Sequence, residues 1–203
     1  YDLRQGLMDE PHRHDYYTLI IVESADGEHV IDFNSYPLHG LTLHFVNPGQ
    51  VHQVKETKRS KGWILTFYHR FLIQHAIADR FISDIHLFKS YGQSAPLPIN
   101  SEHYDTLSEY CGFIESAMRK DIGLKMDVVG AYLKLILIEC HRLSQFEQES
   151  KTQLTESGTD MLKVFRSLVE SHFTKEHHVA FYAGQMSITS DYLNKAIKSY
   201  TGE

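Results

Sequence analysis

Residues 178–202 read HVAFYAGQMSITSDYLNKAIKSYTG, a pattern typical of two short helices joined by a tight turn. The first helix is predicted over residues 179–186, where the small Ala183 lets a second helix approach closely. The second helix is predicted to begin at Ser190, because the side-chain oxygen of Thr189 can accept the amide protons that the first turn leaves without partners. This stretch therefore predicts a helix-turn-helix.

The second helix has an apolar and a polar face. Leu193 and Ile197 lie one turn apart and face inward with Met186 and Ile188, and Gly202 is suited to end the helix. A polar outer face can enter the major groove of DNA, where an exposed Asn pairs with adenine and a Lys with guanine. The residues predicted to contact DNA are Thr189, Ser190, Asp191, Asn194, Lys195 and Lys198. The alternative is an amphipathic helical hairpin with a solvated polar face.

Three longer helical patterns precede this motif. Residues 161–173 carry apolar side chains at helical spacing, which predicts a helix packed on the motif through Met161, Leu162, Phe165, Leu168, Val169 and Phe173. Residues 148–158 are polar without periodicity and predict a linker. Residues 102–119 and 126–146 predict two longer helices, the second apolar on more than one side. A helix that is apolar on two sides needs two neighbours, so we expect residues 101–147 to form a homodimer; the alternative is burial within one chain.

The N-terminal part has the character of short strands separated by turns. The strands are predicted at residues 17–22, 29–33, 41–46 and 63–67, and the turns at Asp26-Gly27, Asn34-Ser35 and Pro48-Gly49. Strands this short and evenly spaced favour a sandwich or barrel over a parallel α/β sheet. One or two short helices are expected over residues 69–88.

Composition limits the class of protein. The chain has 203 residues and a net charge of −6, and residues 158–203 hold five basic and five acidic side chains. This balance counts modestly against DNA binding and requires phosphate contacts to be few and local. No apolar run reaches the ~20 residues that span a bilayer, so we expect a cytoplasmic protein with no membrane partner. Cys111 and Cys140 are expected to be buried, reduced thiols.

Three histidines mark the predicted mouth of the barrel. His12 and His14 are spaced to share one face of an extended segment, and His52 follows Pro48-Gly49, so a metal site is one interpretation. A carboxylate four residues beyond the second histidine would normally complete it, and that position holds Thr18. We therefore expect no metal and no cofactor, with the histidines hydrogen-bonded within the mouth.

A pocket for a small molecule is the better use of a small barrel, which encloses apolar walls with a few placed polar groups. The residues predicted to line it are Arg13, His14, Tyr17, His44, His52 and Trp63. The chain has no glycine-rich phosphate loop and no nucleophile with a recognisable local signature, which argues against an enzyme.

The order of these parts resembles the AraC/XylS-type transcriptional regulators. The resemblance rests on Pro11-His12-Arg13-His14-Asp15, on Asn47-Pro48-Gly49-Gln50-Val51-His52, on Phe165-Arg166, and on residues 178–183, 188–189, 192–193 and 200–202. It implies a mixed β and α chain: a cupin-like effector-sensing barrel at 1–100, a helical dimerisation element at 101–147, a linker at 148–158 and a first helix-turn-helix at 159–203. By the same resemblance, Asp191, Asn194 and Lys195 contact bases.

The family has two helix-turn-helix units, whereas this sequence ends after one, so we expect a fragment that binds DNA weakly. The function expected is sequence-specific transcriptional regulation controlled by a small effector, with promoter DNA as partner. The alternative is a metal-dependent cupin enzyme that uses His12, His14 and His52. A barrel that binds no ligand and serves only to dimerise is a third interpretation.

Overall fold

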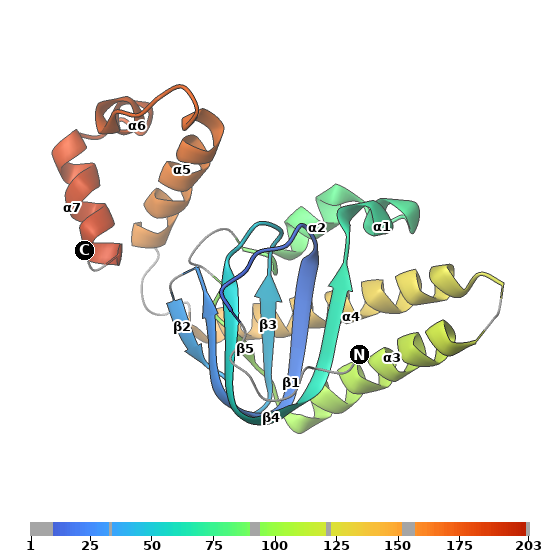
Figure 1. The fold of residues 1–203 in the computed structure, drawn as a ribbon. Helices are drawn as coiled ribbons and strands as arrows, with labels where there is room; N and C mark the ends of the chain where they lie inside the picture. The colour runs from blue at the N-terminus through green and yellow to red at the C-terminus, as the bar shows by residue number, and fades with distance from the viewer. Residues whose placement is uncertain (1–9, 33, 90–93, 121–122, 152–156, 202–203) are drawn as a thin grey trace. The chain divides into compact units, whose positions relative to one another are not determined.

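The computed structural model describes residues 10–32, 34–89, 94–120, 123–151 and 157–201 (Figure 1). The chain divides into two compact units, residues 1–148 and 149–203. The elements are β1 (Tyr17–Ile31), β2 (Asn34–Pro37), β3 (Thr42–Val46), β4 (His52–Phe67), α1 (His69–Gln74), α2 (Asp79–Ile85), β5 (Leu97–Pro98), α3 (Ser101–Arg119), α4 (Lys125–Lys151), α5 (Ser157–His172), α6 (Val179–Gln185) and α7 (Ser190–Thr201).

The first unit is built on one antiparallel sheet whose central strand is β1. One edge of β1 pairs with β4 along nearly its whole length, from Tyr17↔Phe67 to Ile31↔His52. The other edge is shared, because β3 pairs with the first part of β1 and β2 with its last part, and β5 extends the sheet beyond β3. The long strands curl this sheet into the half-barrel of Figure 1, as a cupin-like domain requires. The prediction of mixed β and α structure with an N-terminal barrel-like sheet is thereby confirmed.

The predicted turn at Asp26-Gly27 is wrong, because both residues lie inside β1, opposite Lys58 and Glu56 of β4. The register shifts around Ser24 and Asp26, so the glycine belongs to an irregular, strongly bent pairing, as at a β-bulge. Gly27 has a φ of 156°, and a Cβ there would lie 2.0 Å from the carbonyl oxygen of Lys55. The glycine therefore permits close approach of two strands, a role that a local pattern cannot separate from a turn.

Two other turns had different outcomes. Asn34-Ser35, predicted as a turn, begins β2 instead. The Pro48-Gly49 turn is confirmed: the Gln50 amide donates to the Asn47 carbonyl at 3.1 Å, and Gly49 has a φ of 84°, which suits the third position of a type II turn. The predicted strand at residues 29–33 is the end of β1 as far as residue 31, and Phe33 lies outside the described residues.

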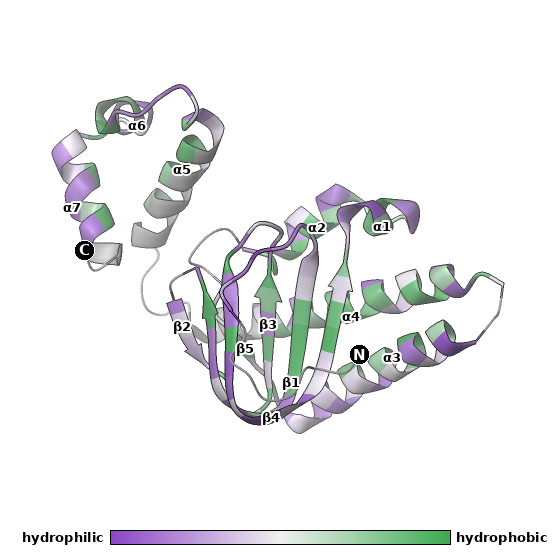
Figure 2. Ribbon diagram, in the orientation of Figure 1, coloured by the Kyte–Doolittle hydropathy of each residue, from purple (hydrophilic) through white to green (hydrophobic). Residues whose placement is uncertain are grey.

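Helices cover one face of the half-barrel. Leu19, Ile21, Leu43 and Phe45 alternate along β1 and β3 and pack with Leu107 and Cys111 of α3 and Leu133, Ile136, Leu137 and Cys140 of α4. Figure 2 shows the hydrophobic colour along these strands and in stretches of α3 and α4. Both cysteines are free and buried, as predicted. The two short helices expected over residues 69–88 are α1 and α2, and α3 begins where the Asn100 side chain accepts the His103 amide at 2.9 Å.

The second face of α4 leaves apolar side chains in contact with solvent. Val128, Ala131, Leu135 and Ile138 are spaced by three and four residues, and Leu135 and Ile138 are 44% and 37% exposed. The expectation of a helix apolar on two sides is therefore confirmed. The predicted linker is too long, because residues 148–151 continue α4 and Ser157 begins α5; residues 152–156 lie outside the described residues.

The second unit contains α5, α6 and α7. Leu193 is fully buried between Tyr182 and Ala183 of α6 and partly buried residues of α5. The Tyr192 amide donates to Thr189 Oγ1 at 3.2 Å, which confirms the predicted N-cap. Phe173 does not join this core, because α5 ends at His172 and the ring is 58% exposed. Gly202 lies outside the described residues.

Within the described part of the chain, none of the helices combines the length and the apolar character needed to cross a bilayer.

The close strand approach at Gly62 predicts a sharp difference between two glycine substitutions. A Cβ at Gly62, whose φ is 144°, would lie 2.1 Å from the Ile21 carbonyl oxygen, whereas a Cβ at Gly112 in α3 meets nothing within 4 Å. Gly62→Ala should lower the free energy of unfolding by about 1–3 kcal/mol or more. Gly112→Ala should raise it by about 0.5–1 kcal/mol, since it only relieves the cost of a helical glycine. Urea unfolding of both variants tests this, and equal effects would contradict the strand pairing.

Candidate functional site: a histidine relay at the mouth of the half-barrel

Backbone hydrogen bonds bring two distant segments together at the mouth. His12 and His52 form an isolated antiparallel bridge, in which the His12 amide donates to the His52 carbonyl at 3.0 Å and the His52 amide donates to the His12 carbonyl at 2.8 Å. The Gly49 amide donates to the His14 carbonyl at 2.8 Å. Gln50 fixes the turn by accepting the Asn47 amide at 2.6 Å and donating to the carboxylate of Asp32, also at 2.6 Å. The N-terminal segment is thus held against the start of β4.

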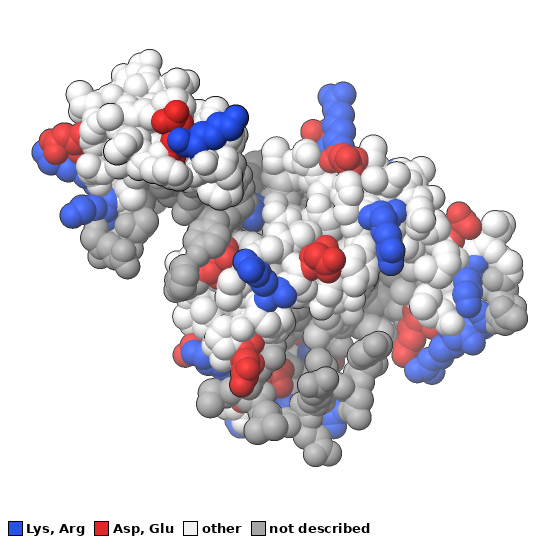
Figure 3. All heavy atoms as spheres, turned by 45° about the horizontal axis from the view of Figure 1, so that its top comes forward, with Lys and Arg blue, Asp and Glu red and all other residues white. Residues whose placement is uncertain are grey.

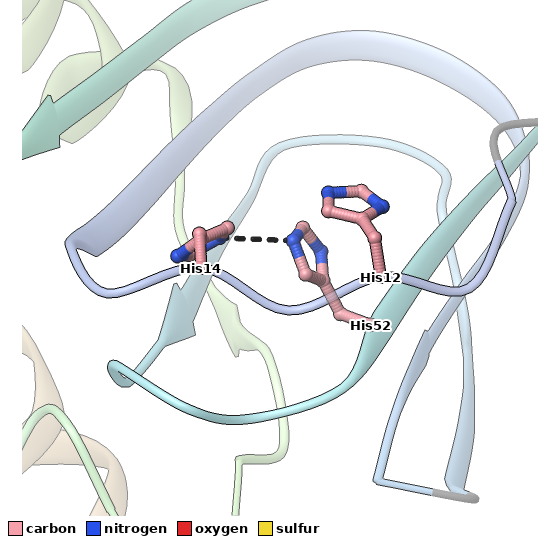
Figure 4. Close-up of side chains that lie close together, drawn as sticks. All are labelled: His12, His14 and His52. Atoms are coloured by element: carbon pink, nitrogen blue, oxygen red, sulfur yellow. Dashed lines mark hydrogen bonds between the residues drawn. The ribbon is translucent and has the colours of Figure 1, made fainter.

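His12, His14 and His52 converge at this point, as their spacing predicted (Figure 4). One ring nitrogen from each lies within 4.8 Å of the others, a separation at which the three side chains can hold a metal ion. His14 Nε2 lies 3.0 Å from His52 Nε2, the contact drawn dashed in Figure 4. The expected hydrogen bonding among these histidines is therefore present. Thr18 stands at the position where a carboxylate would complete a metal site, and its hydroxyl lies 3.3 Å from His14 Nε2.

The triad formed by His12, His14 and His52 is the outer end of a longer chain of imidazoles. His52 Nδ1 lies 3.1 Å from His29 Nε2, and His29 Nδ1 lies 3.0 Å from His44 Nδ1. His44 Nε2 lies 3.2 Å from Thr42 Oγ1, and His14 Nδ1 lies 2.7 Å from the Tyr16 carbonyl oxygen. His29 and His44 are fully buried and His52 is nearly so. We call His14, His52, His29 and His44 the relay.

A single acceptor orients every hydrogen bond of the relay. The Tyr16 carbonyl can only accept, so His14 Nδ1 carries the proton and a neutral His14 must accept at Nε2. His52 then donates from Nε2 and accepts at Nδ1, His29 donates from Nε2 and accepts at Nδ1, and His44 donates from Nδ1. At the far end, the Thr42 hydroxyl donates to His44 Nε2. Each ring holds one proton and is satisfied on both sides.

Burial keeps these rings neutral. The pKa of His29 is lowered to about 2, that of His52 to about 3 and that of His44 to about 4. Removal from water is the largest cause for each, and neighbouring imidazoles contribute to the lowering for His29 and His52. Burial also lowers the pKa of His14. Neutral imidazole is the form that binds metals and that can both donate and accept hydrogen bonds.

The six residues predicted to line an effector pocket divide into three groups. His14, His44 and His52 belong to the relay. Arg13 is exposed beside the triad in sequence. Tyr17 and Trp63 lie away from the relay. Tyr17 packs on Phe67 and Phe88, and Trp63 Nε1 donates to Ser108 of α3 at 2.9 Å, both within the helix-covered core.

His29 was missed by the sequence analysis. It lies in a stretch that was predicted as a strand, two residues before the buried Ile31, and this alternation was the available signal that its side chain points inward. Thr42 was also missed, although its place two residues before His44 in a predicted strand puts the two side chains on one face.

The second unit carries the other candidate site. The predicted DNA-contacting residues Asp191, Asn194, Lys195 and Lys198 are exposed on α7, and Lys195 Nζ lies 3.0 Å from Asp191 Oδ2. Thr189 is exposed at the helix start, and Ser190 is half-buried. On the face seen in Figure 3, the described basic and acidic side chains are interspersed and neither sign collects into a patch.

A curled antiparallel half-barrel with a polar mouth defines the first unit as a cupin-like domain. The family model of the AraC-like ligand-binding domain matches residues 4–129, and the chain belongs to the AraC family of regulators. The HTH-type transcriptional activator RhaS of Pectobacterium carotovorum is 23% identical over 196 residues, which cover 94% of this chain and 66% of that relative. The crystal structure of an apo ToxT variant from Vibrio cholerae has a TM-score of 0.44 and 14% sequence identity, and the match covers 98% of this chain and 73% of that chain.

The neutral relay predicts a loss of stability in mild acid. An unfolded histidine takes up a proton near pH 6.5, but the folded pKa values of His29, His44 and His52 are far lower. As the pH falls from about 6.5 towards 4, the free energy of unfolding should fall by about 1.4 kcal/mol per pH unit for each histidine. Urea unfolding with EDTA present measures this slope. His44→Gln should reduce the slope by one such increment, and the exposed His39→Gln should leave it unchanged; identical slopes for all three proteins would be inconsistent with a buried neutral relay.

Proposed function

We propose that this chain is the effector-sensing and DNA-binding part of a transcriptional regulator. The half-barrel binds a small effector at its histidine-lined mouth, α3 and α4 hold two copies together, and α7 enters the major groove. The observation that carries the proposal is the combination of an AraC-like ligand-binding domain with a downstream pair of helices whose second member buries Leu193 and exposes Asn194 and Lys195. A cytoplasmic location accompanies this function.

The case for DNA binding rests on α7. Leu193 anchors the helix on α6, and the N-cap at Thr189 gives the helix a fixed start. The exposed side chains of Asp191, Asn194 and Lys195 lie in the first two turns, the part of a recognition helix that contacts base edges. The relative RhaS is an HTH-type transcriptional activator, which supports the same use of this region. The chain spans only 66% of that relative, so further DNA contacts from elsewhere in the whole protein are part of the proposal.

The case for effector binding rests on the mouth. His14 and His52 offer placed polar groups, and the exposed Arg13 is available for an anionic group. The matched family is that of a ligand-binding domain, which supports this use of the half-barrel over a purely structural one. The similarity to RhaS, a transcriptional activator, also favours a regulator over a metal-dependent cupin enzyme.

The case for a dimer rests on α4. The exposed stripe of Val128, Ala131, Leu135 and Ile138 has the three-and-four spacing of a coiled-coil seam. A second copy of the same helix, related by a two-fold axis, would cover this stripe with the same residues. Arg142 and Glu139, paired at 2.7 Å, lie at one end of the stripe and provide a polar rim.

Substitutions in α7 test the DNA-binding proposal in the natural full-length protein. Lys195→Ala should relax sequence discrimination by ~1–3 kcal/mol at one base pair, because a base contact is lost. Lys198→Ala should weaken binding to all sequences alike, as loss of a phosphate contact does. Selection from a random duplex pool, followed by anisotropy titrations, measures both. Lys175→Ala, an exposed lysine outside α7, is the control. Unchanged base preference in Lys195→Ala would refute the assigned orientation of the helix.

A matched pair of Ile→Asp substitutions tests the dimer. Ile138→Asp places a charge in the proposed seam and should shift the chain from dimer to monomer in sedimentation equilibrium, because an unpaired charge is costly to bury. Ile73→Asp changes an isoleucine of α1 that is 57% exposed and lies outside the stripe, so it should leave the dimer intact. Monomeric wild-type chain, or dissociation by both substitutions, would rule out the α4 seam.

A further inference from the structure

We propose that His12, His14 and His52 bind one divalent transition-metal ion, and that His29, His44 and Thr42 are positioning residues for it. This reverses the expectation of an empty site that followed from Thr18. It rests on the proposed sensing function in one respect: the bound ion is the effector.

The outer hydrogen bonds of the triad are those of a metal site. A metal-bound histidine donates its other ring N–H to a carbonyl or another acceptor, which fixes the ring. His14 Nδ1 donates to the Tyr16 carbonyl at 2.7 Å, and His12 Nδ1 donates to the Glu10 carbonyl at 2.9 Å. His52 Nδ1 faces His29 Nε2 at 3.1 Å. Each ring is thus held through Nδ1, so that Nε2 is the nitrogen directed to the ion.

The relay lets His52 become a ligand without a net loss of protons. A metal at His52 Nε2 requires the proton on Nδ1, where it donates to His29 Nε2. His29 then donates from Nδ1 to His44, and His44 donates from Nε2 to the Thr42 oxygen. The proton on His52 Nε2 is released to solvent. Each inner ring passes its proton one step along the relay towards His52, and the Thr42 hydroxyl gives its proton to His44 Nε2. Thr42, which is half-buried, then takes up one proton from solvent. Every ring stays neutral, and only the direction of the hydrogen bonds reverses.

The donor set selects the kind of ion. Three imidazoles and no carboxylate favour Zn²⁺, Ni²⁺ or Cu²⁺ over Mg²⁺ and Ca²⁺, which require oxygen ligands. Three protein ligands also leave a coordination position open for water or a ligand atom. The Thr18 hydroxyl, 3.3 Å from His14 Nε2, is a neutral oxygen at the side of this position. His12 and His14 keep the triad accessible from solvent, whereas the other relay rings are enclosed.

The direct test is metal titration of chelator-treated chain carrying no affinity tag of histidines. Zn²⁺ should bind with one ion per chain, and Co²⁺ should give visible d–d absorption bands that report nitrogen ligands, while Mg²⁺ should not bind. His52→Ala should weaken Zn²⁺ binding by more than the roughly 100-fold that loss of an outer partner can cost. His39→Ala, an exposed histidine outside the triad, should bind like wild type. Wild-type binding no tighter than that of His52→Ala would overturn the proposal.

Substitutions at His29 test the relay while leaving all three ligands in place. His29→Phe removes the acceptor for His52 Nδ1 and should weaken Zn²⁺ binding by about 10–100-fold. His29→Gln restores an acceptor oxygen and should recover most of the Zn²⁺ affinity. If the phenylalanine variant does not fold, the glutamine variant is compared with the wild type instead. Equal affinity of the wild type and both variants would remove His29 from the positioning role.

The outcomes separate this proposal from the proposed function. If Zn²⁺ does not bind but an organic metabolite raises the melting temperature of the chain, the metal site fails and effector sensing stands. If Zn²⁺ binds tightly but changes neither DNA affinity nor transcription from a target promoter in the full-length protein, the metal site stands and its sensing role fails.

Discussion

The pairing of β1 with β4 along nearly their whole length is the constraint on which the first unit depends. It sets Ile31 opposite His52, which places His29 and His52 within hydrogen-bond distance although they are far apart in sequence. It also requires two backbones to approach at Gly27 and Gly62, where a side chain would collide with the opposite carbonyl. The helices then cover one face, and the relay occupies the other. The mouth is therefore a product of strand register more than of any local motif.

Much of the architecture could be predicted from the sequence because it is local. The alternation in β3, the cap at Thr189 and the apolar periodicity of α4 are read from neighbouring residues, and the structure agrees with them. Some of the predicted turns between strands were wrong, for a physical reason. A glycine that ends a strand and a glycine that lets a strand bend look alike until the partner strand is known, which is why Gly27 was taken for a turn.

The candidate site could be predicted only in part. The spacing of His12 and His14 and the turn before His52 predicted the triad that lies together in the structure. Tyr17 and Trp63 were assigned to the pocket by residue type, but which face of a strand lines a cavity is decided by where the helices pack. The contact of His29 with His52 needed the long-range register of β1 and β4. Short-range patterns therefore identify the rim of this site and miss its interior.

The orientation of the relay has an evolutionary consequence. Because the proton position of each ring is set by its neighbour, replacing His29 leaves both His52 and His44 with an unmatched nitrogen in a buried place. Replacing one relay histidine alone therefore costs more stability than replacing the whole set, and these positions are free to change only together. We expect relatives of this chain to carry either the whole set of relay histidines or a wholly different apolar filling, with few intermediates between them.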